Sequence, residues 1–487
     1  MPSPGQTISI NDPGLGIATP ATSTPCFVGG CSSGTANVLK SHSSPTDLRA
    51  EFGEGPVVED AVHCLAVSGG PVRLMKMTTS VAAAISAVTP TRVSTSTGTI
   101  PTSGTPNDDY AVEVEIMTTG TVGVGTFKYT LERNRPTTAR TYSEVTTIPA
   151  GGAFLIPNTG VTITFTPGGG PIFFEKGDKF SFDTTAAMWN ATNLGTAVTA
   201  LLADSTLWNF LIGSGKHATG AAAATIFAAL GTHLTSFANV HRYVGAMMDA
   251  GKDIAATTIS AFAAVSDRRI LAAYGDCDIT SSKPFAGWGA PRRPVLGCFG
   301  AAAARNLIST DLARFASGPL PGVLEITHDD YKLGAIMDDA KISALRTFPG
   351  IDGFFIHNAK MKSPAGSDFQ FWQHRRIMDE ACRVTYEAQL RYLSAGLRTK
   401  ADGTVDERDA ARIEADITAK LQAALLTPKN AEGTTGHVSA LAYRISRTHP
   451  LLTTNQLNSE VAVRPFGYPK FIVTQLGYAA NVQQAAA

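Results

Sequence analysis

Residues 58–77 have the sequence VEDAVHCLAVSGGPVRLMKM, and this stretch decides the fold class. Its apolar residues recur at the i, i+3, i+4, i+7 and i+8 spacing of a helix with one apolar face: Val58, Ala61, Val62, Leu65 and Ala66. Gly69-Gly70-Pro71 ends the helix, and residues 72–77 follow as a short strand. Residues 26–28 form an earlier apolar strand, so the pattern predicts strand, helix and strand of an α/β unit.

Residues 92–187 are different in kind, being rich in Thr, Gly and Pro. Apolar and polar side chains alternate with period two in four stretches, which are residues 110–116, 126–131, 161–165 and 179–182. Turn signals such as Pro157-Asn158-Thr159-Gly160 separate these stretches. The pattern predicts an antiparallel β domain that is inserted into the α/β region.

Helical patterns and short buried strands alternate again over residues 188–362, which favours parallel strands joined by crossovers. The strands expected there include residues 243–247, 269–274, 295–298 and 353–356.

In residues 363–487, Ser367-Asp368 is expected to cap a helix that runs through Leu393, and Asp406 is expected to cap a second helix that runs to about residue 426. The apolar face of that second helix is predicted to be Ala410, Ile413, Ile417, Leu421 and Leu425. Strands are expected at residues 437–445, 460–465 and 470–476.

The chain begins with a proline-punctuated segment in which only Thr7-Ile8-Ser9-Ile10 alternates like a strand. We therefore predict an α/β (α+β) multidomain protein, with an α/β core assembled from N- and C-terminal segments around the inserted antiparallel β domain. The predicted parts are an arm and linker at 1–25, the first part of the core at 26–91, the β domain at 92–187, the α/β domain at 188–362 and a C-terminal domain at 363–487.

Charge and hydropathy limit the partners. Forty Lys+Arg residues balance forty Asp+Glu residues, so no basic field is present to hold nucleic acid, and we predict no nucleic-acid partner. We expect no membrane insertion, because no apolar run was found that approaches the ~20 residues of a membrane helix. Met1 to Asn11 lacks the charge and apolar core of a secretory signal, which predicts synthesis in the cytoplasm.

The sequence contains no catalytic, cofactor or metal motif that we can identify. Gly213-Ser214-Gly215-Lys216 is not a phosphate loop, because His217 stands where a Ser or Thr is required. One acidic group was considered as a metal or acid–base site, but a solvated loop is the favoured interpretation: Glu325, His328, Asp329, Asp330, Asp338 and Asp339. We predict that the protein is no enzyme and uses no cofactor or metal.

Six cysteines are spread along the chain: Cys26, Cys31, Cys64, Cys277, Cys298 and Cys382. Buried free thiols are the favoured interpretation. The alternative is that some of them become cross-links if the product leaves the reducing cytoplasm, and sequence alone does not rank the possible pairings.

The order of motifs resembles the tail sheath proteins of contractile phage tails, particularly Mu-like phages, and of related contractile injection systems. The resemblance depends on the following residues in order: Pro2-Ser3-Pro4-Gly5, Phe27-Val28-Gly29, Phe52-Gly53, Gly69-Gly70-Pro71-Val72-Arg73, Val463-Arg464-Pro465-Phe466-Gly467-Tyr468-Pro469 and Leu476-Gly477-Tyr478. The β-rich insertion between the two groups also fits, so the resemblance covers the whole chain.

The resemblance implies a structural subunit that stacks in hexameric rings around an inner tube and contracts to drive the tube through a target cell envelope. Its implied partners are other copies of itself, the inner tail tube protein, the baseplate and the tail terminator, in the tail of a virion that is assembled in the host cytoplasm. The residues implied in strand exchange between subunits are Thr7, Ile8, Ser9, Ile10, Val461, Val463, Phe471, Ile472 and Val473. Arg375 and Arg376 are candidates for contact with the tube.

Two alternatives remain at this point. Another phage tail or baseplate component would share the composition but would not form long homopolymers on its own. A hydrolase with a β binding insert would require a clustered acid pair or a nucleophile motif, and the sequence shows neither.

Overall fold

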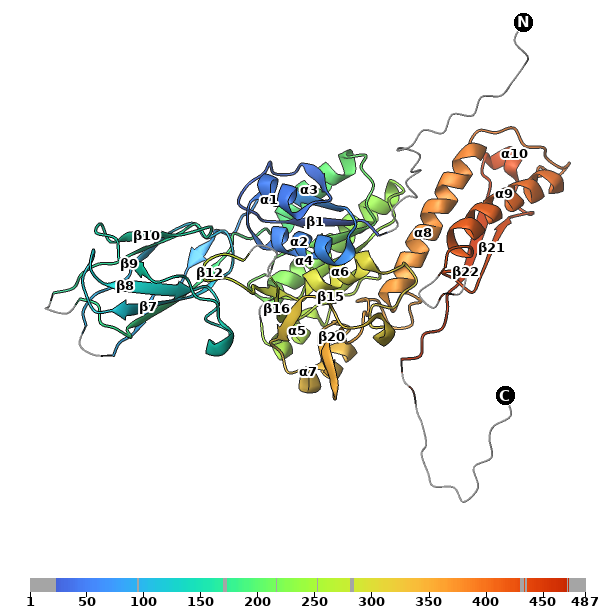
Figure 1. Ribbon diagram of the computed structural model, residues 1–487. Coiled ribbons are helices and arrows are strands. Elements are labelled where there is room, and N and C mark those ends of the chain that lie inside the picture. Colours follow the sequence, from blue (N-terminus) through green and yellow to red (C-terminus); the bar gives the residue numbers. More distant parts are fainter. Residues whose placement is uncertain are drawn as a thin grey trace, which may run out of the picture. The chain divides into compact units, whose positions relative to one another are not determined.

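The computed structural model describes residues 23–93, 96–169, 173–215, 217–251, 253–280, 284–429, 433, 436–470 and 472 (Figure 1). The chain divides into two compact units. The first comprises Met1–Gly396 with Lys429–Thr434, and the second comprises Leu397–Pro428 with Thr435–Ala487. Helices and sheets are mixed in the chain, as an α+β protein requires.

A six-stranded sheet forms the centre of the first unit, with strand order β15-β14-β13-β1-β3-β2. Five of its strands run parallel, and β2 pairs antiparallel with β3 at the edge. The strands are β1 (Pro25–Gly29), β2 (Leu39–His42), β3 (Val72–Lys76), β13 (Phe210–Gly213), β14 (Gly245–Asp249) and β15 (Ile270–Ala273). Strand β1 lies between β3 and β13, so the segments before and after the β-rich residues build one sheet.

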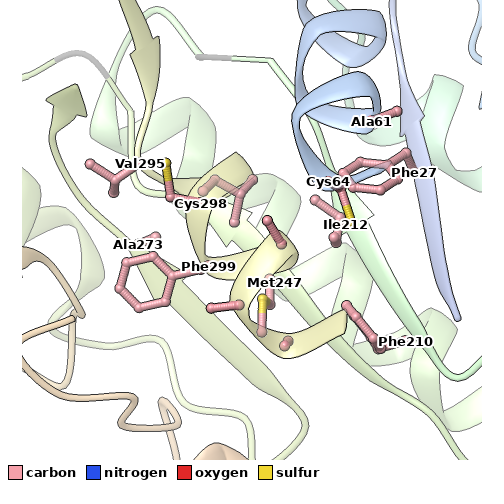
Figure 2. Packing of buried hydrophobic residues seen from close by; sticks show 14 of the residues in the cluster. Phe27, Ala61, Cys64, Phe210, Ile212, Met247, Ala273, Val295, Cys298 and Phe299 are labelled. Carbon is pink, nitrogen blue, oxygen red and sulfur yellow. The ribbon is translucent and has the colours of Figure 1, made fainter. Parts of the chain in front are cut away.

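Alternate residues of these strands enter two different cores, because successive side chains of a strand point to opposite faces. Phe27, Ile212 and Met247 pack with helices α1 (Pro45–Phe52), α2 (Pro56–Ser68) and α6 (Leu296–Arg305), as Figure 2 shows for part of this core. Val28, Leu211 and Met248 pack with α3 (Ala191–Ala203), α4 (Gly220–Asn239) and α5 (Ala255–Phe262). Burial on both faces explains why the strands are continuous apolar runs.

Helix α4 corrects one expectation about apolar segments. By length and composition alone this 20-residue helix could cross a membrane, and it is the single such helix in the part of the chain that the structure describes. Its large side chains, among them Ile226, Phe227 and Leu234, are buried in the core beside the sheet. Alanine is the commonest residue at the remaining positions, and it raises the hydropathy of the helix without giving it a large apolar outer face.

The β-rich region contains two antiparallel sheets with the orders β4-β12-β7-β8-β9, where β5 also pairs with β12, and β10-β11-β6. Their strands are β4 (Ala84–Ile85), β5 (Thr89–Thr91), β6 (Thr102–Gly104), β7 (Ala111–Thr118), β8 (Thr126–Thr130), β9 (Thr146–Thr147), β10 (Ala153–Ile156), β11 (Val161–Thr164) and β12 (Lys179–Thr185). Val112, Val114 and Phe127 face a shared aromatic core, whereas Glu115 and Lys128 on the same strands form an ion pair. All four predicted strands are present, and β4 and β5 precede the expected boundary at residue 92.

Residues 284–293, here called the strap, join this β-rich region to the α/β core. Trp288 is buried in the core of the β sheets and lies 5.2 Å from the Tyr110 ring, centroid to centroid. Arg293 donates to both carboxylate oxygens of Asp108 at 2.6 and 2.5 Å, and both residues are buried. The backbone N–H groups of Gly289 and Ala290 donate to one oxygen of Glu132. The strap therefore fixes the insertion to the core through buried polar bonds.

The remainder of the first unit contains small antiparallel sheets and two helices. Its elements are β16 (Asp276–Ile279), β17 (Arg292–Pro294), β18 (Val323–Ile326), α7 (Asp330–Asp339), β19 (Leu345–Phe348), β20 (Ile351–Ile356) and α8 (Trp372–Gln389), with short 3₁₀ turns at Thr137–Ala139, Phe315–Ser317 and Leu390–Tyr392. The prediction of parallel crossovers is wrong here, because β16–β17, β16–β18 and β19–β20 all pair antiparallel.

Two predicted elements also differ from the structure. Residues 295–298, expected to be a strand, form the cap and first turn of α6, because a short continuous apolar run is compatible with a buried strand and with a buried helix. The helix expected after Ser367 begins at Trp372 instead, because the Ser367 hydroxyl accepts from the Phe369 N–H in a local turn.

The second unit consists of α9 (Glu407–Leu425), β21 (Ala440–Ile445), α10 (Leu451–Thr454) and β22 (Ser459–Arg464). Asp406 caps α9 by accepting from the Arg408 N–H, and the predicted apolar face of this helix is buried. Both predictions for α9 are confirmed. The apolar side of α9 packs against β21 (Figure 1).

Candidate inter-subunit site

Strands β21 and β22 form an isolated antiparallel hairpin in the second unit. Leu441 lies opposite Val463, Tyr443 opposite Val461, and Ile445 opposite Ser459. Tyr443 and Ile445 are buried and the two valines are half-buried, whereas Arg444 and Glu460 on the other face are exposed. The hairpin therefore has one apolar face and one polar face.

The backbone of β22 offers hydrogen-bonding groups at its outer edge. Ser439 N–H donates to the Arg464 carbonyl and Ser446 N–H to the Asn458 carbonyl, so these even-numbered residues of β22 face β21. Backbone groups alternate in direction along an antiparallel strand, which turns the N–H and C=O of Val461 and Val463 to the opposite side. Among the residues that the structure describes, β22 has β21 as its one strand neighbour. An edge of this kind is a template for another strand.

Charged residues hold the hairpin on α9. The Arg447 guanidinium contacts Glu414 at 2.8 Å and Glu407 at 3.0 Å, two positions that lie two turns apart on one side of the helix. The Ile445 N–H donates to the Glu414 carboxylate at 2.7 Å. The hydrogen bond from Arg447 lowers the pKa of Glu414, so the carboxylate stays charged at neutral pH. The apolar contacts and these ion pairs together fix the orientation of the open edge within the second unit.

The structure describes three of the residues implied in strand exchange, and the other six lie outside the described residues. Val461 and Val463 lie in β22, and Ile472 is 85% exposed and belongs to no strand. The structure pairs residues 460–463 with β21, which lies within the strand expected at residues 437–445. The alternation of residues 440–445 marks that strand, but it does not tell which strand is its partner. Thr7, Ile8, Ser9, Ile10, Phe471 and Val473 lie outside the described residues.

The two candidate tube contacts, Arg375 and Arg376, are buried in the first unit, and this corrects the expectation. Arg375 donates to Asp379 at 2.5 Å, and the Arg376 guanidinium lies 4.6 Å from the centroid of the Phe210 ring. Both side chains therefore support the core around α8. The sequence contained no signal that separates such arginines from surface ones.

The acidic cluster has structural tasks. Asp329 caps α7 through the Lys332 N–H, Asp330 accepts from the N–H and hydroxyl of Thr347, and Asp338 pairs with Lys360 at 2.5 Å. Within the described part of the chain, no group of three or more His, Cys, Asp or Glu residues is placed to hold a metal ion.

The cysteines are all free thiols, and four of them are buried: Cys26, Cys64, Cys277 and Cys298. Cys31 and Cys382 are partly exposed. Cross-links between subunits would therefore require these last two, unless the subunit opens.

Solved structures share this fold along nearly the whole chain. The helical sheath of the anti-feeding prophage in its contracted state matches with a TM-score of 0.53 and 13% identity, over 98% of this chain and 99% of that one. The sheath complex of an extracellular contractile injection system, PVC, in its contracted state matches with a TM-score of 0.51 and 12% identity, over 99% and 98%.

A chain of the anti-feeding prophage baseplate matches with a TM-score of 0.52 and 13% identity, over 98% and 99%. No protein-family model matches the chain, and no curated protein sequence matches it significantly. The chain therefore has the fold of the sheath subunits of contractile injection systems.

Proposed function

We propose that this protein is the structural subunit of a contractile sheath, and that it polymerises around an inner tube and contracts to drive the tube through a cell envelope. The observation that carries the proposal is the fold shared end to end with sheaths in the contracted state. An open strand edge in the second unit supports it, because a polymer needs a surface that only another chain completes.

Strand addition at β22 is the proposed link between copies. Residues 7–10 of one subunit would lie along β22 of another and bond to the outward N–H and C=O groups of Val461 and Val463. Each such bond contributes about 1 kcal/mol net, so a short strand gains only a few kcal/mol per link. Many weak links in a lattice then give a stable tube while each one can adapt during contraction.

Contraction would move the first unit as one body. The strap fixes the β-rich region to the α/β core through buried bonds, so hinge motion belongs in the segments between subunits. The residues 11–22 would serve as the linker that reorients, because Thr24 already bonds to Asn209 and Pro25 begins β1. We further propose that the β-rich region faces outward and that the C-terminal domain faces the tube.

The proposed partners are other copies of this chain in stacked hexameric rings, the inner tube protein, the baseplate and the tail terminator. The balanced charge of forty Lys+Arg against forty Asp+Glu residues supports a role without nucleic acid. The proposed location is the tail of a virion or injection particle, after assembly in the host cytoplasm. The role is structural and not enzymatic.

Two matched proline variants test the strand edge. Val461→Pro removes an N–H that points outward, so the hairpin should persist, whereas Ala462→Pro removes an N–H that bonds to β21. Electron microscopy of the expressed wild-type protein should show tubes. Val461→Pro should give a folded subunit, by circular dichroism, that forms none.

Ala462→Pro should instead lose protection of β21 amides in hydrogen exchange. Deletion of residues 1–12 should reproduce the Val461→Pro result. Normal tubes from Val461→Pro would reject β22 as the acceptor. A wild-type protein that stays monomeric alone, or that hydrolyses a glycan, would favour the baseplate or hydrolase alternative.

A further inference from the structure

Two buried thiols meet beneath the strap. The Cys277 and Cys298 Sγ atoms lie 3.6 Å apart, although the residues are 21 positions apart in the chain. Cys277 lies in β16 and is fully buried, and Cys298 lies in α6 and is 2% exposed. Figure 2 shows Cys298 beside Val295 and well apart from Cys64, so Cys64 is not a competing partner. The contact is close to van der Waals separation, and a small approach of the two sulfurs would allow a bond.

A histidine stands against this pair. His63 of α2 stands close enough to Cys298 to interact with its sulfur, and Asp60 and Glu59 of the same helix lie near its ring. Helices α2 and α6 approach closely because Gly297 has no side chain, and a Cβ there would lie 2.5 Å from an Asp60 oxygen. The same His63 lines a surface pocket of about 230 Å³ with Val67, Thr280 and Gly322. The pocket brings small solutes to the residue that contacts the buried sulfur.

The charges favour a thiolate at Cys298. The hydrogen bond with Cys277 lowers the pKa of the Cys298 thiol, burial opposes this, and His63 lowers the pKa further. The same thiol–thiol bond and burial raise the pKa of Cys277. Burial lowers the pKa of His63, but Cys298 and the nearby acids raise it by more. Because His63 stands beside Cys298, we assign Cys298 as the nucleophile and Cys277 as the thiol that resolves it.

We propose that Cys277 and Cys298 are a peroxide-oxidisable pair that closes into a disulfide within the subunit, with His63 as the proton carrier. The Cys298 thiolate attacks one oxygen of hydrogen peroxide, the O–O bond breaks, and a sulfenic acid forms. The departing hydroxide takes a proton from His63 and becomes water. The Cys277 sulfur then attacks Cys298, the S–O bond breaks, and hydroxide leaves with the Cys277 proton as a second water.

The disulfide would close a loop that contains the strap. Arg293 and Trp288, which hold the β-rich region, lie between the two cysteines in sequence. Cross-linking the ends of this loop restricts the unfolded chain, and the midpoint of thermal unfolding should therefore rise on oxidation. The inference does not depend on the role as a sheath, because it concerns a single subunit.

The test uses the full-length protein, reduced and then freed of reductant. After treatment with hydrogen peroxide the protein is denatured, alkylated and digested, and the peptides are identified by mass spectrometry. The expected product is a linked pair of peptides with Cys277 and Cys298, and an intact mass lower by two hydrogens. Recovery of both cysteines as alkylated thiols, or linked to other cysteines, would overturn the proposal.

Three variants sharpen the test. Cys26→Ser removes a buried thiol of the other core and should leave the cross-link unchanged. Cys277→Ser should give no disulfide and a Cys298 sulfenic acid that dimedone labels. His63→Gln should slow oxidation about tenfold near neutral pH and recover at alkaline pH, where hydroxide removes the thiol proton. Equal rates for His63→Gln and wild type across pH would exclude His63 as the proton carrier.

Discussion

The β-rich insertion and the β21–β22 hairpin are both antiparallel, but they differ in how their sheets are completed. The insertion has two sheets around an aromatic core, and a distant segment supplies Trp288 to complete it. The hairpin has two strands on one helix, and Val461 and Val463 direct backbone groups away from both. Two strands alone are marginal in water, and a hairpin gains stability from a third strand or a packed face.

The insertion is a closed structure with its own core, whereas the hairpin keeps a strand edge whose backbone groups face outward. Buried charge pairs complete the insertion, and partly exposed ion pairs attach the hairpin to α9. Buried pairs cost much when one partner is removed, whereas exposed pairs contribute little. The buried charges of the first unit and the exposed ion pairs of the hairpin should therefore respond to mutation with different magnitudes and to pH with opposite signs.

Removal of Arg293 should have the largest effect. Arg293→Ala leaves the Asp108 carboxylate buried without its bidentate partner, which should cost about 3–5 kcal/mol of the free energy of unfolding. Urea unfolding measures the change. The matched control is Lys332→Ala, because that ion pair with Asp329 is exposed, and it should cost no more than about 0.5 kcal/mol. Equal costs for the two variants would contradict the view that the strap is a buried clamp.

The buried carboxyl of Asp60 should make the first unit less stable as pH rises. Burial raises its pKa from 3.8 to about 7, although Arg293 opposes the shift. A folded-state pKa above the unfolded value gives stability below the unfolded pKa that is lost as pH rises to the folded one. Asp60→Asn should match wild type near pH 4 and exceed its stability by up to about 4 kcal/mol near pH 8.

Unfolding in urea across this pH range provides the measurement. Asp352→Asn changes an exposed acid of β20 and should leave the pH dependence as it is in wild type. A variant Asp60→Asn that keeps the full fall in stability from acid to alkaline pH would show that another group is responsible.

The Arg447 ion pairs should have the smallest effect and the opposite pH sign. Arg447 lowers the pKa of Glu414, so the stabilisation is present above the ordinary carboxyl pKa and is lost as pH falls through the folded-state value. Arg447→Met should therefore cost about 1 kcal/mol near pH 7 and little in acid. Hydrogen exchange of the β21 amides detects such a change, with Lys420→Met on the exposed side of α9 as the control. A cost that persists in acid would assign the effect to packing.

Apolar periodicity in the sequence correctly predicted the helices and strands that have one buried face and one solvent-exposed face. The face of α9 from Ala410 to Leu425 and the strands of the insertion were correct, because each has one buried side and one wet side. The start of α6 was predicted as a strand, since the short apolar run at residues 295–298 is compatible with either a buried strand or a buried helix. Apolar periodicity identifies a helix or strand only where its two faces differ in polarity.

Long-range partners could not be predicted from the sequence. Arg293 and Asp108 are 185 positions apart, and neither neighbourhood indicates a buried pair. The same applies to Arg375 and Arg376, which resemble surface arginines until the core around them is known. A strand was predicted at residues 460–465, but its pairing with β21 was not, because alternation fixes the face of a strand and not its neighbour.

The position of the strap in the sequence has a consequence for synthesis on the ribosome. The core of the β-rich region lacks Trp288, and Asp108 lacks Arg293, until the chain has grown more than a hundred residues past β12. Strand β1 likewise waits for β13. Domains usually fold as they emerge, but here the insertion must be completed late, after the last strand of the central sheet has been synthesised. A nascent chain stalled before residue 284 should therefore expose the insertion to protease.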